Sequence, residues 1–248
     1  MRRALLAFLA LGAFALGAAC LDLPDRSPRE AAPPGAEVIT VRAADDRPLD
    51  ARLWVRDPAW LVIYLHEYQR TQRDWWEEAS HGLPGEPSAM TFDLRGHGDS
   101  GGDHQDFDRM EGDVRAVVAY ARSRGYQRIV LVGAGLGGTV GLLVARDEPA
   151  VTVVGLSAAS DFAGLDALEA SKAAGPRLAI VAAREDLSAR ESLEQIARAA
   201  GLDGTRALLL PGRAHGRALL NTDSEGATRR LMRDAFDQTW RQPANFNR

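Results

Sequence analysis

The stretch of sequence that decides the fold is Arg128-Ile-Val-Leu-Val-Gly133-Ala-Gly135-Leu-Gly-Gly138-Thr-Val-Gly-Leu-Leu-Val-Ala-Arg146. Its first part is short, apolar and β-branched, which is typical of a buried strand. The glycines that follow indicate a sharp turn, and the apolar run after them predicts a helix. The stretch therefore predicts a strand, a tight turn and a helix in direct succession.

Two functional patterns share this local structure, and they imply different chemistry. Gly133, Gly135 and Gly138 satisfy the G-x-G-x-x-G pattern of dinucleotide-binding turns. The same turn also fits the nucleophile elbow, G-x-S-x-G, which lifts a serine above the edge of a sheet. In that second interpretation Gly135 stands where the serine belongs. The rest of the chain has to decide between the two.

Composition points to an ordinary globular protein. The chain has 248 residues, of which 46% are hydrophobic and 26% are charged, enough for one large domain with its own core. The formal net charge of -4 gives no electrostatic reason to expect nucleic acid as a partner. No spacing of histidines, cysteine or acidic residues predicts a metal site, and we expect no cofactor.

The N-terminus predicts export and anchoring. Residues 1–19 contain a short basic start, an apolar segment and small residues, which is the pattern of a secretory signal peptide. Cys20 follows directly and is the only cysteine of the chain. The surrounding residues resemble a bacterial lipoprotein box, although Gly17 stands where such boxes usually carry leucine. We therefore expect lipidation of Cys20 and attachment to a membrane of the bacterial cell envelope.

The remaining chain divides into a proline-rich tether, residues 20–37, and one domain, residues 38–248. The domain begins with a predicted hairpin, residues 38–55, and continues as strands that alternate with helices. This order predicts a doubly wound, mostly parallel α/β sheet. The connection of residues 155–176 holds one predicted helix, 161–174, which leaves no room for a large lid.

Four landmarks then resemble the α/β-hydrolase family, in particular its lipase-, esterase- and serine-aminopeptidase-like members. His66 follows the predicted central strand, as in the family's oxyanion loop. The segment Asp93-Leu-Arg-Gly-His-Gly-Asp-Ser-Gly is similar to the D-x-R-G-x-G-x-S segment before the elbow. Asp186 and His215 fall where the family's catalytic acid and histidine belong, so that Gly135, Asp186 and His215 follow its chain order.

The resemblance implies a serine at position 135, and Gly135 has no atom that can attack a substrate. It also implies His-Gly in the oxyanion loop, where this chain has His66-Glu67. The expected oxyanion-hole positions are Glu67, Tyr68 and Leu136. Glu67 would oppose a developing negative charge if it points inward, and would have no such effect if it points to solvent.

The leading hypothesis is an envelope lipoprotein with an α/β-hydrolase fold that is non-hydrolytic or altered in activity. It would bind a small ester- or amide-like molecule. One alternative is an active ester or peptide hydrolase that uses Asp186 and His215 with water or with a displaced nucleophile. Ser157 is the nearest candidate for that nucleophile, although it is also typical of a loop or cap hydroxyl. Dinucleotide binding is the other alternative, but no acidic residue follows at the tip of the next strand.

Overall fold

The computed structural model describes residues 31–82 and 86–241. The expected signal peptide, Cys20 and the first part of the tether lie outside the described residues. Within the part that is described, no helix is long and apolar enough to cross a membrane. The first strand begins at Glu37, one residue before the start of the predicted hairpin.

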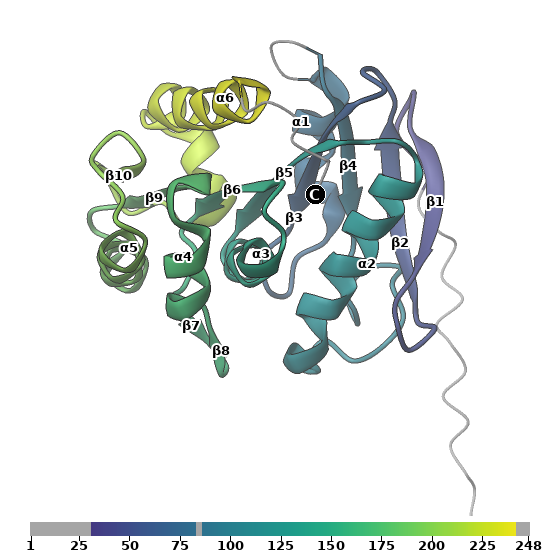
Figure 1. Cartoon of the computed structure of the whole chain (residues 1–248), viewed down its shortest axis with the longest axis horizontal. Coiled ribbons are helices and arrows are strands. Elements are labelled where there is room, and N and C mark those ends of the chain that lie inside the picture. Colours follow the sequence, from purple (N-terminus) through teal and green to yellow (C-terminus); the bar gives the residue numbers. More distant parts are fainter. Residues whose placement is uncertain (1–30, 83–85, 242–248) are drawn as a thin grey trace, which may run out of the picture. The chain divides into compact units, whose positions relative to one another are not determined.

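The domain is built on one eight-stranded sheet with the order β1-β2-β4-β3-β5-β6-β9-β10 (Figure 1). Only β2 runs against its neighbours, and the other strands pair in parallel. This confirms the mostly parallel α/β sheet with a leading hairpin. The strands are β1 (Glu37–Arg42), β2 (Pro48–Trp54), β3 (Trp60–Leu65), β4 (Ser88–Phe92), β5 (Arg128–Ala134), β6 (Val151–Leu156), β9 (Leu178–Ala183) and β10 (Ala207–Leu210).

Side chains alternate along the central strands and so create two apolar layers. In β3, Leu61 and Ile63 join the layer on one face, whereas Val62 and Tyr64 join the layer on the other. Both faces of a parallel sheet must be covered, which is why these strands are almost entirely apolar. One face is covered by α2 (Met110–Ser123), α3 (Leu136–Asp147), α4 (Leu168–Ala174) and α5 (Leu187–Ala200). The other is covered by α1 (Trp76–His81) and α6 (Glu225–Arg241), as Figure 1 shows.

The connection between β6 and β9 differs from the expected single helix. Its first part is a small hairpin of β7 (Asp161–Phe162) and β8 (Leu165–Asp166), and the helix begins only at Leu168. Ala163 and Gly164 form the turn between β7 and β8, and both have positive φ, at 51° and 90°. A right-handed helix cannot continue through such a turn. The connection nevertheless contains no large lid.

Short 3₁₀ turns account for the other differences. One precedes α2, which therefore begins at Met110 and not at residue 106 as the sequence indicated. Another follows the loop after β10, and its leucines pack in the same apolar layer as α6. These turns are η1 (Gln72–Trp75), η2 (Phe107–Arg109), η3 (Gly175–Arg177) and η4 (Gly216–Asn221).

Candidate active site

The turn between β5 and α3 consists of one residue, Gly135. Its backbone angles, φ 50° and ψ −119°, lie in a region that L side chains rarely adopt. A Cβ atom at Gly133 would overlap the backbone of Gly137, so the strand and the helix are in direct backbone contact here. Gly133 is thus needed for the tight strand-to-helix turn, and Gly137 for close approach of α3 to the carbonyl groups of Leu65 and His66. This is the turn that we interpret from the sequence as a nucleophile elbow with glycine in place of serine.

The carboxyl ends of neighbouring parallel strands bring the predicted residues together. Asp186 follows β9, and its Oδ2 accepts a 2.6 Å hydrogen bond from Nδ1 of His215, which follows β10. The other carboxylate oxygen of Asp186 caps α5 by accepting from the N–H of Ala189. A Cβ atom at Gly135 would lie 3.5 Å from Nε2 of His215. The expected arrangement of Gly135, Asp186 and His215 is therefore present, and their roles remain a prediction.

Glu67 lies over the elbow and does not point freely to solvent. A Cβ atom at Gly135 would be 3.3 Å from Cγ of Glu67, so the two residues occupy adjacent space. Glu67 Oε1 accepts a 2.8 Å hydrogen bond from the backbone N–H of Arg217, which holds the carboxylate near the histidine loop. The Arg217 guanidinium is itself bound by Glu78, with Nη2 2.9 Å from Oε2. Of the two orientations that the sequence left open, the structure has the inward one.

The positions predicted for an oxyanion hole lie at the same pocket. Leu136 is the first residue of α3, where a backbone N–H has no carbonyl partner within the helix. Tyr68 and Leu136 both line the pocket in front of Gly135. Glu67, Tyr68 and Leu136 therefore share one pocket, and their role as an oxyanion hole stays a prediction.

The pocket in front of the elbow has a volume of about 280 Å³, which suits a small molecule. Two of its side chains carry carboxylates, Glu67 and Asp161, and no arginine or lysine lines it. The rings of Tyr68 and Phe162 lie 5.6 Å apart and form one wall. The lining consists of Glu67, Tyr68, Gly135, Leu136, Ser157, Ala159, Asp161, Phe162, Ser188 and His215.

Ser157 is one of the residues that line this pocket. The sequence favoured a loop or cap hydroxyl at this position over a residue of the site. Ser157 is 3% exposed, has φ 51°, and its Oγ has no hydrogen-bond partner among the described residues. A buried polar group without a partner costs about 1–3 kcal/mol. Because Oγ makes no hydrogen bond, His215 does not activate Ser157 in this arrangement. The signal in the sequence was its place directly after a buried strand.

His66 holds the loop that carries Glu67. With a neutral ring, Nδ1 donates to the carbonyl of Glu67 at 2.7 Å, and Nε2 accepts from the N–H of Leu94 at 2.9 Å. Burial lowers the pKa of His66 to about 3, because the charged ring is poorly solvated there. The residue expected from the oxyanion loop is thus a buried, uncharged support of that loop.

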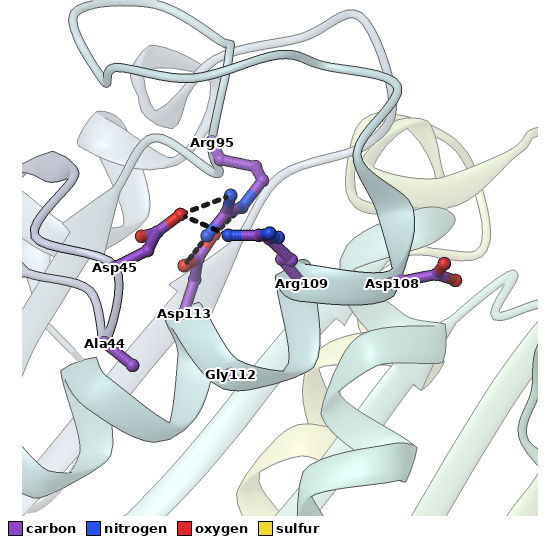
Figure 2. A pocket seen from close by; sticks show the side chains of 7 residues that line it. All are labelled: Ala44, Asp45, Arg95, Asp108, Arg109, Gly112 and Asp113. Carbon is purple, nitrogen blue, oxygen red and sulfur yellow. Dashed lines mark hydrogen bonds and ion pairs between the residues drawn. The ribbon is translucent and has the colours of Figure 1, made fainter.

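A second hollow, of about 310 Å³, lies next to α2 and is shown in Figure 2. Arg95 is its centre and makes two 2.6 Å hydrogen bonds to Asp113. Arg95 also pairs with Asp45, which in turn binds Arg109. These charges satisfy one another and join the β1–β2 hairpin to α2, so we interpret the cluster as structural. Among the described residues, no group of side chains is arranged to hold a metal ion.

Comparison with known proteins identifies the family. The model of the alpha/beta hydrolase family matches residues 75–247, well over half of the chain. The chain therefore belongs to the alpha/beta hydrolase family. A comparison with curated proteins gave no match.

Solved structures agree on the fold. An esterase from Pyrococcus furiosus has a TM-score of 0.64 at 15% identity, over 82% of this chain and 90% of that one. A putative aryl esterase from Burkholderia cenocepacia has a TM-score of 0.65 at 17% identity, over 83% of this chain and all of that one. The enol-lactonase from Burkholderia xenovorans LB400 has a TM-score of 0.65 at 12% identity, over 80% and 100%. At such identities the likeness concerns the fold.

Proposed function

We propose that the protein is a non-hydrolytic member of its family that binds a small ester- or amide-like ligand in the pocket over Gly135. One observation carries this proposal. Asp186 and His215 are hydrogen-bonded and placed beside the elbow, but position 135 has no nucleophilic atom. In a serine hydrolase, loss of the serine alone lowers turnover by about 10⁶-fold. A pocket of this kind, without an attacking atom, can bind a small ester- or amide-like ligand but cannot form an acyl-enzyme.

The position of Glu67 supports the same proposal. Acyl transfer passes through an intermediate with a negatively charged oxygen, which the oxyanion donors stabilise. Two unit charges 4 Å apart interact by about 4 kcal/mol at an effective dielectric constant of about 20. The carboxylate of Glu67 lines the same pocket and therefore raises the energy of that intermediate. Both departures from the family pattern act against hydrolysis.

The proposal is tested by hydrolysis of p-nitrophenyl acetate and p-nitrophenyl butyrate. We expect the wild-type protein and the His215→Ala variant to show the same rate, equal to the buffer background. Wild-type turnover that His215→Ala abolishes would overturn the non-hydrolytic function. A rate that both proteins share above background would indicate a contaminating activity, which repurification of both proteins removes.

The alternative is hydrolysis by water that His215 activates as a general base. The specific observation in its favour is the retained pair of Asp186 and His215 beside the empty side of Gly135. It predicts a slow wild-type rate that depends on His215 and survives Ser157→Ala. A rate that Ser157→Ala abolishes would instead favour the displaced nucleophile.

Dinucleotide binding through Gly133, Gly135 and Gly138 is the alternative we favour least. Glu67 and His215 occupy the space directly in front of Gly135, where a pyrophosphate would have to lie. β6 ends at Leu156 without an acidic residue that could bind a ribose hydroxyl.

We also propose that the protein is anchored in the bacterial cell envelope through lipidated Cys20. The lipoprotein-like sequence of residues 1–20 supports this proposal. Lipid attached to a cysteine associates a protein with a membrane without a spanning helix. Expression with labelled palmitate should label the wild-type protein and leave Cys20→Ala unlabelled. Labelling of Cys20→Ala would contradict the anchor.

A further inference from the structure

We propose that the pocket over Gly135 binds a small organic cation, namely a molecule with an ammonium group beside an aromatic or apolar part. This inference rests on the proposed function, because it names the ligand class of the same pocket. It depends on three independent properties of the lining, which are its charge, its aromatic wall and its unpaired hydroxyl.

The charge of the lining is negative. Glu67 and Asp161 contribute carboxylates, and the one basic side chain of the lining, His215, is hydrogen-bonded to the carboxylate of Asp186. The Glu67 carboxylate accepts a hydrogen bond from the backbone N–H of Arg217, and the Arg217 guanidinium pairs with Glu78. An ammonium group in the pocket would therefore meet carboxylates with no competing arginine or lysine side chain in the lining.

The charge on Arg217 is directed elsewhere. Its guanidinium binds Glu78, which is buried, and also lies over the ring of Trp75. Glu78 additionally lies 3.8 Å from Arg229. The guanidinium thus belongs to a separate ion cluster, and the carboxylate of Glu67 keeps the capacity to bind a second donor.

The aromatic wall gives the apolar part of the ligand a surface. Tyr68 and Phe162 line the pocket, and Phe107 packs behind both, with ring centroids 5.5 Å from each. The rings of His97 and His104 also lie near Tyr68, with centroids 5.9 Å and 6.0 Å away. Contacts with four neighbouring rings restrict the movement of Tyr68, and an aromatic ring in a pocket wall attracts an ammonium group that approaches its face.

Ser157 provides the independent sign of a ligand. Ser157 is a lining residue of the pocket and is 3% exposed, and its buried Oγ has no hydrogen-bond partner among the described residues. Buried hydroxyl groups are normally paired, so an unpaired one at a pocket wall indicates a partner from outside the chain. Rotation of the side chain about χ1 would bring Oγ to the pocket, where the N–H of an ammonium group is a donor of the required kind.

The test is calorimetric titration of the purified full-length protein with three probes that share one phenyl ring. These are 2-phenylethylamine, which is a cation at neutral pH, 2-phenylethanol, which is neutral, and phenylacetate, which is an anion. We expect the amine to bind about tenfold more tightly than the alcohol, since one close charge pair accounts for a factor of this size. Phenylacetate should bind more weakly than the alcohol.

Matched variants locate the effect. Glu67→Gln keeps the size of the side chain and an acceptor for the N–H of Arg217, and should remove most of the preference for the amine. Asp161→Asn should reduce it by a smaller factor, because Asp161 is exposed. Ser157→Ala should weaken amine binding about fivefold, as expected for one hydrogen bond. Glu169→Gln, on the exposed side of α4, is the control and should leave all three affinities unchanged.

Three results would overturn the inference. These are no binding of 2-phenylethylamine at millimolar concentration, equal binding of the amine and the alcohol, and an amine preference that Glu67→Gln leaves intact. Each of these results can occur while the wild-type protein fails to hydrolyse esters. The titrations can therefore refute cation binding without refuting the non-hydrolytic function. Conversely, ester turnover that depends on His215 would overturn the function whatever the titrations show.

Discussion

Glu67 and Gly216 are in direct contact, because a Cβ atom at position 216 would overlap the carboxylate of Glu67. Gly216 also has φ 54°, in the left-handed region that favours glycine. Together with the hydrogen bond from Arg217 N–H to Glu67, this contact fixes the loop after β3 to the loop after β10. The two loops that a hydrolase uses for its oxyanion hole and its histidine are therefore joined through a side chain.

The first prediction concerns this contact. Gly216→Ala should lower the free energy of unfolding by about 2 kcal/mol, of which about half comes from backbone strain and half from displacement of Glu67. In a Glu67→Ala background the same change should cost only about 1 kcal/mol, since the steric part is gone. Urea denaturation of the four proteins measures both values. An equal loss in the two backgrounds would show that Glu67 is not displaced.

The second prediction concerns restoration of hydrolysis. Gly135→Ser adds a nucleophile whose Cβ lies 3.5 Å from Nε2 of His215, but the carboxylate-bearing side chain of Glu67 remains 3.3 Å away. We expect little activity toward p-nitrophenyl acetate from this variant. Gly135→Ser/Glu67→Gly restores both the serine and the glycine of the family pattern, and should be at least about tenfold more active.

The control for that experiment is the triple variant that also carries His215→Ala, which should lose the gained activity. If the double variant were no faster than Gly135→Ser alone, Glu67 would have no part in suppressing hydrolysis. If the single variant were already fully active, the serine alone would account for the loss.

The third prediction concerns the pH dependence of stability. Burial lowers the pKa of His66 from its ordinary value of 6.5 to about 3. Between these values the unfolded chain binds a proton that the folded protein does not. The contribution of His66 to stability is therefore complete above about pH 6.5 and is lost as the pH falls toward the folded pKa. Burial lowers the pKa of His97 as well, with the same sign.

From about pH 7.5 to about pH 5, His66 alone should remove about 2 kcal/mol from the free energy of unfolding. Asp93 acts in the opposite direction but nearer its ordinary value of 3.8, because burial raises its pKa. Thermal unfolding of the wild type and of His66→Gln at several pH values separates the contribution of His66 from those of the other titrating groups. We expect the free energy of unfolding to change less steeply with pH in His66→Gln than in the wild type. Identical slopes would show that His66 does not cause this pH dependence.

The fourth prediction concerns the ion cluster of Figure 2. Arg95 and Asp113 are both buried, so Arg95→Met leaves the carboxylate of Asp113 without its main partner and should cost about 3–5 kcal/mol. Arg95→Met/Asp113→Leu removes both charges and should cost less than the single change. Arg109→Gln is the control, since Arg109 is 59% exposed and its pair with Asp45 should contribute under about 1 kcal/mol. Equal losses for the single and double variants would contradict an uncompensated buried charge.

Most of the fold could be predicted because its signals are local. The apolar runs of β3 and β5, the glycines around position 135 and the hairpin before residue 55 each specify their own structure from neighbouring residues. The exception in the connection after β6 is instructive. Alanine has no strong preference against a helix, yet Ala163 adopts a positive φ because the hairpin turn requires it.

The candidate site was predictable only in part. The order of Gly135, Asp186 and His215 along the chain sufficed to place them together. The orientation of Glu67 did not follow from sequence, since it depends on Gly216 and Arg217, which are about 150 residues away. Ser157 was hidden for a similar reason, because whether its hydroxyl finds a partner depends on the packing of several loops.

The elbow has a consequence for the energetics of this site. A serine at position 135 would have to adopt φ 50°, which costs about 1–2 kcal/mol for an L side chain, whereas glycine adopts it without penalty. An enzyme tolerates that strain because the exposed hydroxyl supplies its chemistry. With glycine at position 135, the chain adopts this backbone shape without that strain. Glycine at this position therefore favours stability, and the Gly135→Ser variant should be less stable than the wild-type protein.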